Sequence, residues 1–299
     1  MRYKFVLIIV LILLAALTGV FWLRVTRRPE VAKETNLSPL QAMTVPPQFD
    51  DESVFLTPIK FSTTTPTAQK VTGISVPHHL LATDIIANAF KFASLSRPDQ
   101  ILLMSPDHFS LGQTDVSVSL SNFSTVFGLL NNDSRASEKL LNLPFVSVQD
   151  FYYREHGLGA ELPFIKYYFP NAKIIAITIK ESAPQDKLNQ LVDALKKVLD
   201  KNSFVIQSTD FSHYLTPQNA ETHDEQTIKA LQTGNPKQLF TLNQPDNIDS
   251  IAAQYIQMRL QNEFYSAKLN ILAHKNSQDY TTEPLTSTTS YIVQAYTKN

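Results

Sequence analysis

Short apolar runs rich in β-formers alternate with helical patterns along most of this chain, and this alternation restricts its fold more than any other feature. In the segment DKLNQLVDALKKVLD, leucines recur every three to four residues, which is typical of a helix that lays one face on a sheet. The alternation predicts an α/β architecture. Strands are predicted at Val71–Val76, Gln100–Met104, Val116–Leu120, Lys173–Ile179, Ser203–Gln207, Lys268–Ala273 and Ser290–Gln294. Helices are predicted at Leu81–Leu95, Ser134–Leu141, Gly159–Tyr168, Pro184–Leu199, Asn219–Gln232, Pro236–Leu242 and Ser250–Glu263.

An uninterrupted apolar run extends from Phe5 to Leu23, with Arg or Lys on both sides. Its length suits a single membrane span. A cleaved signal peptide is the alternative, since LAALTG offers small residues, but the run is longer than the usual h-region of about 7–15 residues and lacks an A-x-A end. We therefore predict that residues 1–28 form a single-pass membrane anchor, with the rest of the chain outside the cytoplasm.

Residues 29–67 are rich in Pro, Thr and Ser and show no sustained period, which indicates a linker or stalk. Within this segment, Phe55 to Phe61 is apolar enough to pack on the domain as an extra edge segment. The remaining residues, 68–299, have the length of one sizeable domain.

The composition limits the chemistry of that domain. The 26 Lys and Arg balance the 27 Asp and Glu, so there is no basic excess for nucleic acid. The chain has no Cys, which excludes disulfides, thiolate ligands and thiol nucleophiles. Only 7 glycines are present and no phosphate-binding Gly motif occurs. Any chemistry must come from His, Asp, Glu, Ser and Tyr, and the 7 histidines are the first candidates.

Three histidines share one context, just past the end of a predicted buried strand. His78 follows GISVP, His108 follows ILLMSPD, and His213 follows FVIQSTDFS. In open α/β sheets, ligands bind at the carboxyl ends of the strands, where neighbouring loops converge. A single His is usually a hydrogen-bonded structural residue, but three in the same context indicate a metal site or an acid/base site.

Several carboxylates accompany these histidines. Asp107 and Asp210 precede His108 and His213 closely, which suits partners that orient an imidazole, although Asp210 is equally well explained as a turn or helix-capping residue. Asp249 opens a helical pattern and is either a cap or a ligand. The cluster Glu155, His156 and Glu161 enters another helix, a pattern typical of a solvated helix start.

Four strings taken together resemble the Memo family, also called AmmeMemoRadiSam system protein B, whose fold is similar to that of the class III extradiol dioxygenases. The family's PHAGY is matched by residues 77–79, its GPSH or GPNH by SPDH at 105–108, its EHSxExxLPF by EHGLGAELPF at 155–164, and its SSDFSHY by STDFSHY at 208–214. The resemblance extends from about Val71 to the C-terminus. It implies a central mixed sheet flanked by helices.

The resemblance also implies site residues. The histidines that match His78 and His108 ligate a metal in Memo proteins, and the one that matches His213 lines the same pocket. Their third ligand is a Cys, for which Asp249 stands here, with Asp246 as the alternative. A two-His-one-carboxylate set suits non-haem Fe(II), with Zn, Cu or Mn as other occupants.

Two motifs depart from the family pattern. In the first, His79, Leu80 and Leu81 replace the Ala-Gly-Tyr of PHAGY. The other is the EH motif. Gly157 and Gly159 replace the usual Ser and Glu, and Glu161 stands where Gln or His is common. The substrate contacts implied by the family are therefore not carried over to these positions.

These features lead to two hypotheses of different classes. In the first, His78, His108 and Asp249 hold a divalent metal, and His213, positioned by Asp210, acts as general acid/base on an unidentified small molecule. With Fe(II) the reaction would be dioxygenase-like, and with Zn a hydrolysis. In the second, the protein is a non-catalytic, membrane-anchored metal-binding or interaction protein, since fold does not determine activity.

Overall fold

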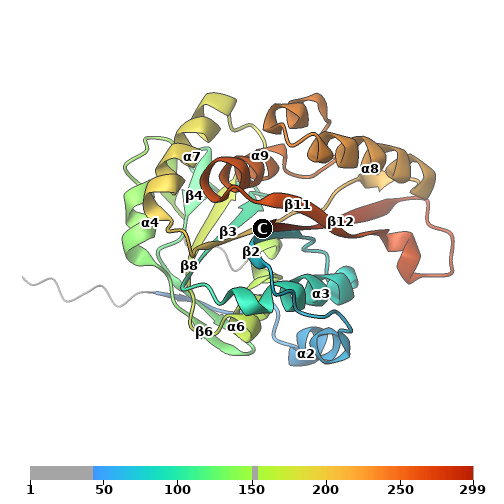
Figure 1. Cartoon of the computed structure of the whole chain (residues 1–299), viewed down its shortest axis with the longest axis horizontal. Coiled ribbons are helices and arrows are strands. Elements are labelled where there is room, and N and C mark those ends of the chain that lie inside the picture. Colours follow the sequence, from blue (N-terminus) through green and yellow to red (C-terminus); the bar gives the residue numbers. More distant parts are fainter. Residues whose placement is uncertain (1–42, 150–153, 299) are drawn as a thin grey trace, which may run out of the picture. The chain divides into compact units, whose positions relative to one another are not determined.

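The structure is a computed structural model that describes residues 43–149 and 154–298 (Figure 1). These residues belong to one compact unit that begins at Ala42. The apolar run from Phe5 to Leu23, for which we predict a membrane anchor, lies outside the described residues. Within residues 43–149 and 154–298, no helix combines the length and apolarity that a membrane crossing requires.

A mixed sheet forms the centre of the unit. Across the described residues it has nine strands, eight of them in the order β10-β12-β2-β9-β3-β8-β4-β7, and β11 pairs with β12. The middle strands β2, β9, β3 and β8 run parallel, whereas β12 and β4 are antiparallel to their neighbours β2 and β8. The strands are β2 (Lys70–Val76), β3 (Gln100–Pro106), β4 (Val116–Val118), β7 (Val146–Val148), β8 (Lys173–Ile179), β9 (Phe204–Ser208), β10 (His213–Leu215), β11 (Lys268–Asn276) and β12 (Thr288–Lys298).

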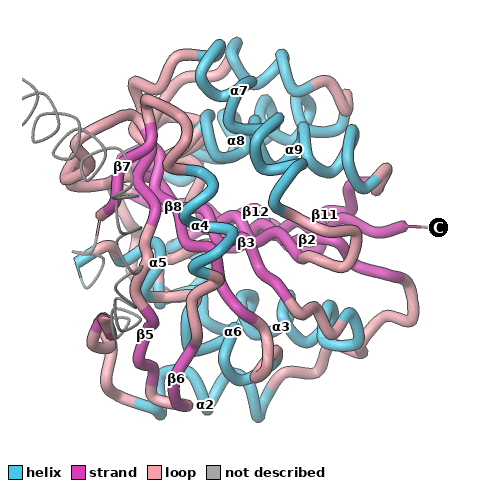
Figure 2. The backbone as a smooth tube through the Cα atoms, turned by 90° about the vertical axis from the view of Figure 1, so that its left-hand side faces the viewer, coloured by secondary structure: helices cyan, strands magenta, loops and turns pink. Residues whose placement is uncertain are grey.

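Helices cover both faces of this sheet, with α2, α3 and α6 on one side and α7, α8 and α9 on the other (Figure 2). A small second sheet, in the order β1-β5-β6, consists of Thr44–Val45, Asn122–Thr125 and Gly128–Leu130. The α-helices are α2 (Glu52–Phe61), α3 (Thr83–Ala93), α4 (Ser134–Leu140), α5 (His156–Gly159), α6 (Leu162–Tyr168), α7 (Gln185–Val198), α8 (Pro217–Gln232) and α9 (Ile251–Leu260).

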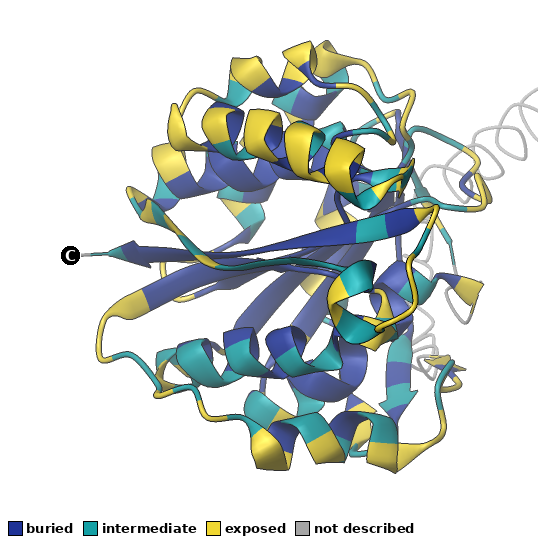
Figure 3. Ribbon diagram, turned by 90° about the vertical axis from the view of Figure 1, so that its right-hand side faces the viewer, coloured by how far each residue is buried: buried dark blue, intermediate teal, exposed yellow. Residues whose placement is uncertain are grey.

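Successive side chains of a central strand point to opposite faces of the sheet, so each strand contributes to two core clusters. In β3, Ile101 and Leu103 pack in the cluster under α3 and α6, whereas Leu102 and Met104 pack in the cluster under α7 and α9. All four side chains are fully buried, which Figure 3 shows for the central strands as a whole. Burial on both faces explains why these strands read as continuous apolar runs rather than as alternating patterns.

The predicted mixed α/β architecture is therefore confirmed. Each predicted strand is present: β8 has the predicted bounds and the others have shifted ends. The helix expected at Gly159–Tyr168 begins at Leu162 as α6, with Pro163 in its first turn, and Gly159 belongs to the preceding one-turn helix α5. The helix expected at Pro236–Leu242 is a 3-10 helix, Pro236–Thr241, and the one expected at Ser250–Glu263 ends as α9, followed by a π turn at Gln261–Tyr265.

Residues 43–67, the later part of the predicted linker, belong to the same compact unit as the domain. Asp51 caps α2 by accepting a hydrogen bond from the Ser53 amide. Phe55 and Ile59 of α2 are buried in the core cluster, and the Phe55 ring lies edge-on to Phe164 at 5.4 Å. The apolar segment from Phe55 to Phe61 thus packs on the domain as part of a helix.

Candidate metal centre

The loops that follow three neighbouring strands meet at the carboxyl edge of the sheet. His78 lies two residues past the end of β2, His108 two past β3, and Asp210 two past β9. Since β9 lies between β2 and β3 and all three are parallel, these side chains emerge side by side. This edge is the ligand-binding position of open α/β sheets.

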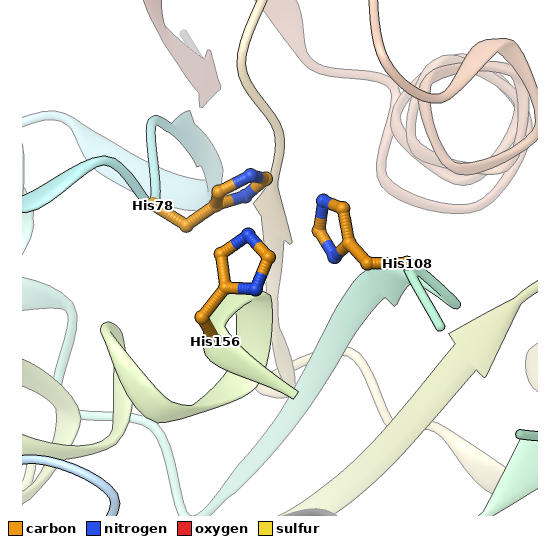
Figure 4. A group of neighbouring side chains, drawn as sticks. All are labelled: His78, His108 and His156. Atoms are coloured by element: carbon orange, nitrogen blue, oxygen red, sulfur yellow. The ribbon is translucent and has the colours of Figure 1, made fainter. Parts of the chain in front are cut away.

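Three histidines face one another at this edge: His78, His108 and His156 (Figure 4). One ring nitrogen from each lies within 4.8 Å of the others. The ring centroids are 4.1 Å apart for His108 and His156, 4.7 Å for His78 and His108, and 5.0 Å for His78 and His156. His156 comes from the first residue of α5, so a fourth segment contributes to the cluster.

The Asp249 carboxylate lies against two of these histidines. Its Oδ2 atom is 3.3 Å from Nε2 of His78 and 3.7 Å from Nε2 of His108. Two donors that each lie ~2.1 Å from one ion are separated by roughly 3.0–3.4 Å in tetrahedral or octahedral geometry. The separation from His78 falls within this range and the separation from His108 is slightly longer, and the donor types present fit a divalent metal. The alternative acid, Asp246, does not line this pocket within the described part of the chain.

Asp249 is fixed by the loop after β9. Its Oδ1 accepts a hydrogen bond from the Thr209 hydroxyl, and its Oδ2 accepts one from the Asp210 amide at 3.1 Å. Burial opposes ionisation of Asp249, but the adjacent imidazoles of His108 and His78 hold its pKa below the usual value. The carboxylate is thus negative, as a metal ligand must be.

Glu155 orients His108. Nδ1 of His108 lies 2.5 Å from Oε1 of Glu155, while Oε2 of the same carboxylate accepts the His108 amide at 3.1 Å. Because a carboxylate accepts, Nδ1 carries the hydrogen and Nε2 is turned toward Asp249. A carboxylate behind an imidazole in this way is the usual arrangement in metal sites. Glu155 also caps α5 by accepting the Gly157 amide.

The two inner histidines differ in their proton affinity. Burial lowers the pKa of His78 well below its ordinary value, so its imidazole is neutral. Burial acts in the same direction on His108, but the adjacent carboxylates of Asp249 and Glu155 outweigh it and raise the His108 pKa to about 10. A metal ion would therefore displace a proton from His108. The Ser208 hydroxyl lies 3.1 Å from His78 Nδ1, which leaves Nε2 of His78 directed at Asp249.

His213 lies beside this cluster. Its Nδ1 is 2.5 Å from the Phe211 carbonyl, which can only accept, so the hydrogen is on Nδ1 and Nε2 is the basic nitrogen. Asp210 Oδ2 is 3.9 Å from that Nε2, beyond hydrogen-bond length, while Oδ1 accepts the His78 amide at 3.1 Å. Burial, followed by the charge of Asp249, raises the Asp210 pKa well above its ordinary value.

These side chains line a pocket of about 500 Å³ that contains His78, His108, His156, His213, Asp210 and Asp249. Asp107 also lines it, but its carboxylate accepts the amides of Leu111 and Gly112 and so closes the turn after β3. The residue that orients His108 is instead Glu155, 47 positions further along the chain.

Sequence reasoning did not assign a role to Glu155 or His156. The sequence pattern predicts a solvated helix start at these positions, which is wrong for Glu155, because its side chain is buried. Local spacing alone does not reveal that α5 begins against β3. The signal that could have found them is the motif match itself, since Glu155 and His156 match the first two letters of the EHSxExxLPF motif.

An α/β fold with a histidine and carboxylate cluster at the carboxyl edge of its sheet defines a protein with a candidate metal centre. The sequence matches the family described as Memo-like protein over residues 53–294. The chain belongs to this family.

Individual relatives support the same assignment. The chain is 24% identical over 224 residues to a MEMO1 family protein of Thermotoga petrophila, covering 73% of this chain and 80% of that protein. It is 25% identical over 232 residues to a MEMO1 family protein of Saccharolobus solfataricus, covering 74% and 81%. The crystal structure of an uncharacterized protein from Escherichia coli K12 shares the fold, with a TM-score of 0.50, 11% identity, and coverage of 75% of this chain and 99% of that one.

Proposed function

We propose that this Memo-family protein binds a divalent transition metal through His78, His108 and Asp249. The observation that carries the proposal is the position of Asp249 Oδ2, 3.3 Å and 3.7 Å from the Nε2 atoms of the two histidines. Glu155 behind His108 and Ser208 behind His78 hold both imidazoles with Nε2 turned inward. His156, whose ring nitrogen lies within 4.8 Å of the other two, is placed to add a fourth donor.

Fe(II) is the occupant that we favour, because two imidazoles and one carboxylate with open positions are the donor set of non-haem Fe(II) oxygenases. When bound, Fe(II) supplies positions at which a substrate oxygen and dioxygen are activated, so the activity that we propose is dioxygenase-like. Zn, Cu and Mn accept the same donors.

His213 is the residue that we propose as general acid/base. The hydrogen bond from its Nδ1 to the Phe211 carbonyl fixes the tautomer, so a neutral His213 offers the Nε2 lone pair to a substrate proton in the pocket. Asp210, whose raised pKa favours the neutral acid, lies next to it and would add no second negative charge.

A zinc-dependent hydrolase is the second candidate. The observation that favours it is the third imidazole, since three histidines with one open position form a common catalytic zinc site. In that case Asp249 would accept a proton from bound water rather than ligate. The two candidates therefore differ in whether Asp249 or His156 is the third ligand.

Membrane attachment is a separate part of the proposal. The apolar run from Phe5 to Leu23 has the length of a single span, and we propose that residues 1–28 anchor the chain with the pocket outside the cytoplasm. The substrate would then be a small molecule available at or beyond the membrane.

Metal analysis of the purified full chain tests the ligand assignment. The protein is loaded anaerobically with Fe(II), or with Zn, and compared with His78→Ala, Asp249→Asn and His156→Gln. We expect about one ion per chain in the wild type, and loss of Fe(II) in the first two variants but not in His156→Gln. Retention of Fe(II) by Asp249→Asn with loss from His156→Gln would favour the three-histidine site. A protein that binds metal but neither consumes dioxygen nor hydrolyses esters would be the non-catalytic alternative.

A further inference from the structure

The mouth of the metal pocket carries two exposed aromatic rings on opposite loops. Phe109 follows His108 after β3, and Tyr214 follows His213 in β10; their side chains are 52% and 77% exposed. The Phe109 ring lies edge-on to His156 at 5.9 Å between centroids, and the Tyr214 ring is 5.6 Å from His213. Each ring is thus adjacent to an imidazole of the site, where a bound molecule would cover it.

The charged and titratable side chains that line the pocket around these rings are carboxylates and histidines. Of the described residues that line it, none is Lys or Arg, so apart from the histidines the pocket offers no cationic side chain. Three of its carboxylates already have partners: Asp249 holds His108 and Thr209, Asp210 accepts a backbone amide, and Asp107 closes a turn.

Glu181 is the exception. It lies two residues past the end of β8, lines the pocket and is exposed. Across the described part of the chain its carboxylate has no hydrogen bond or ion pair. Because β8 is the neighbour of β3, with Pro106 paired to Ile179, Glu181 stands on the loop next to Phe109. The mouth therefore combines a free negative charge with two exposed ring faces.

From this combination we infer that the pocket binds an organic cation that carries a planar or apolar group, such as an arylalkyl amine. A separate donor atom of the same molecule would face the metal. Aromatic faces attract cations and flat groups, and a carboxylate completes the recognition of an ammonium. A phosphate or a carboxylate at the same end of the molecule would meet Glu181 at the mouth, where the described lining residues include no Lys or Arg. Only the orientation of the ligand in this inference rests on the proposed metal function; the selection of a positively charged ligand does not.

Three probes with the same ring and different charge test the inference: benzylamine, benzyl alcohol and benzoate. Binding is measured by saturation-transfer NMR and calorimetry at low ionic strength, first on the full chain without metal and then on the zinc-loaded protein. We expect benzylamine to bind roughly 5-fold more tightly than benzyl alcohol, and benzoate to bind most weakly, without metal. Metal content is determined on the same samples, so failure of metal binding is recorded separately from failure of charge selection.

Substitutions distinguish the contribution of the Glu181 charge from that of the two aromatic rings. Glu181→Gln is expected to bring benzylamine down to the affinity of benzyl alcohol, whereas the matched control Glu225→Gln, on exposed α8, should change nothing. Phe109→Leu and Tyr214→Leu should weaken benzylamine and benzyl alcohol alike, and circular dichroism would verify their folding. Benzoate binding as tightly as benzylamine, or unchanged selectivity in Glu181→Gln, would overturn the inference.

Discussion

Nδ1 of His108 and Oε1 of Glu155 lie 2.5 Å apart, although the two residues are 47 positions apart in the chain. The same carboxylate accepts the amide of His108 and caps α5 at Gly157. Glu155 therefore connects the loop after β3 to the start of the helix that carries His156. The orientation of two of the three clustered histidines depends on this one side chain.

Replacing Glu155 tests this dependence. Glu155→Gln preserves the size and the capping oxygen but removes the charge that holds the His108 proton on Nδ1. We expect metal affinity to fall by about 10-fold or more, the usual effect of losing such a partner. Competition with a chelator of known affinity measures the change, and Glu225→Gln serves as the control. An unchanged affinity would show that His108 is held by other contacts.

The departures from two family motifs compensate each other in space. A Cβ built at Gly157 would lie 2.1 Å from Oγ of Ser105 and 3.2 Å from Cε1 of His108. The family motifs have Gly where this chain has Ser105 and Ser where it has Gly157, so the two positions have exchanged their side chains. Ser105 occupies the space that a Ser at 157 would need.

This exchange predicts that substitutions at Ser105 and Gly157 have non-additive effects on stability and on metal binding. Gly157→Ser alone should destabilise the protein by about 1–3 kcal/mol through overpacking, and should weaken metal binding by displacing His108. The double variant Ser105→Gly/Gly157→Ser should recover most of both losses. Denaturant unfolding of the four proteins measures the interaction free energy; additive effects would mean that the two positions do not share this space.

Glu161 is fully buried, and neither carboxyl oxygen has a hydrogen-bond partner within the described residues. Burial raises the Glu161 pKa well above the ordinary value, so the folded protein holds a proton that the unfolded chain releases above about pH 4.5. Stability therefore decreases as pH rises from there toward the folded pKa.

The variant Glu161→Met should remove this penalty. We expect a gain of about 1 kcal/mol in the free energy of unfolding at pH 7, because an apolar side chain of similar size replaces an unsatisfied polar one. The gain should shrink toward pH 4, where both states are protonated. Urea unfolding at pH 4, 5.5 and 7 follows the difference; a loss of stability at pH 7 would indicate that Glu161 has a partner of its own.

A second contribution to the pH dependence of stability comes from a basic group, His274. Its Nε2 lies 2.7 Å from Oδ2 of the buried Asp224, whose Oδ1 accepts the hydroxyls of Ser212 and Ser290 at 2.6 Å each. The hydrogen bond to Asp224 raises the pKa of His274. The stabilisation is thus complete below the unfolded pKa of about 6.5 and is lost as pH rises through the folded pKa.

His274→Asn retains a donor and removes the charge. The wild type should exceed this variant by about 1 kcal/mol at pH 6, and the difference should diminish by pH 9. Thermal unfolding of both proteins across this range measures it. A difference that is independent of pH would mean that the His274 contribution is packing rather than charge.

The sequence predicts the layers of this fold well because β2, β3, β8 and β9 are buried on both faces and therefore read as apolar runs. It also predicts the edge at which His78 and His108 lie, since each follows such a strand. It does not reveal α2, whose capping residue Asp51 lies within a Pro-rich and Thr-rich segment, or the short strands such as β7 and β10, which exist only through pairing with longer neighbours.

The part of the site that sequence reasoning missed depends on long-range contacts. The role of Glu155 requires that α5 begin against the loop after β3, and no local pattern contains that information. Likewise, the hydrogen bond that fixes the His213 ring comes from the Phe211 carbonyl, a backbone group that carries no residue-specific signal. Spacing identifies side chains at the edge of a sheet, but not the partners that orient them.

The most direct test of the account is the anomalous X-ray diffraction of crystals loaded anaerobically with Fe(II). We predict one anomalous peak per chain at ~2.0–2.3 Å from Nε2 of His78, Nε2 of His108 and Oδ2 of Asp249. A peak coordinated by His78, His108 and His156 without Asp249 would contradict the two-His-one-carboxylate centre. The absence of any peak in this pocket at full metal loading would contradict the metal centre itself.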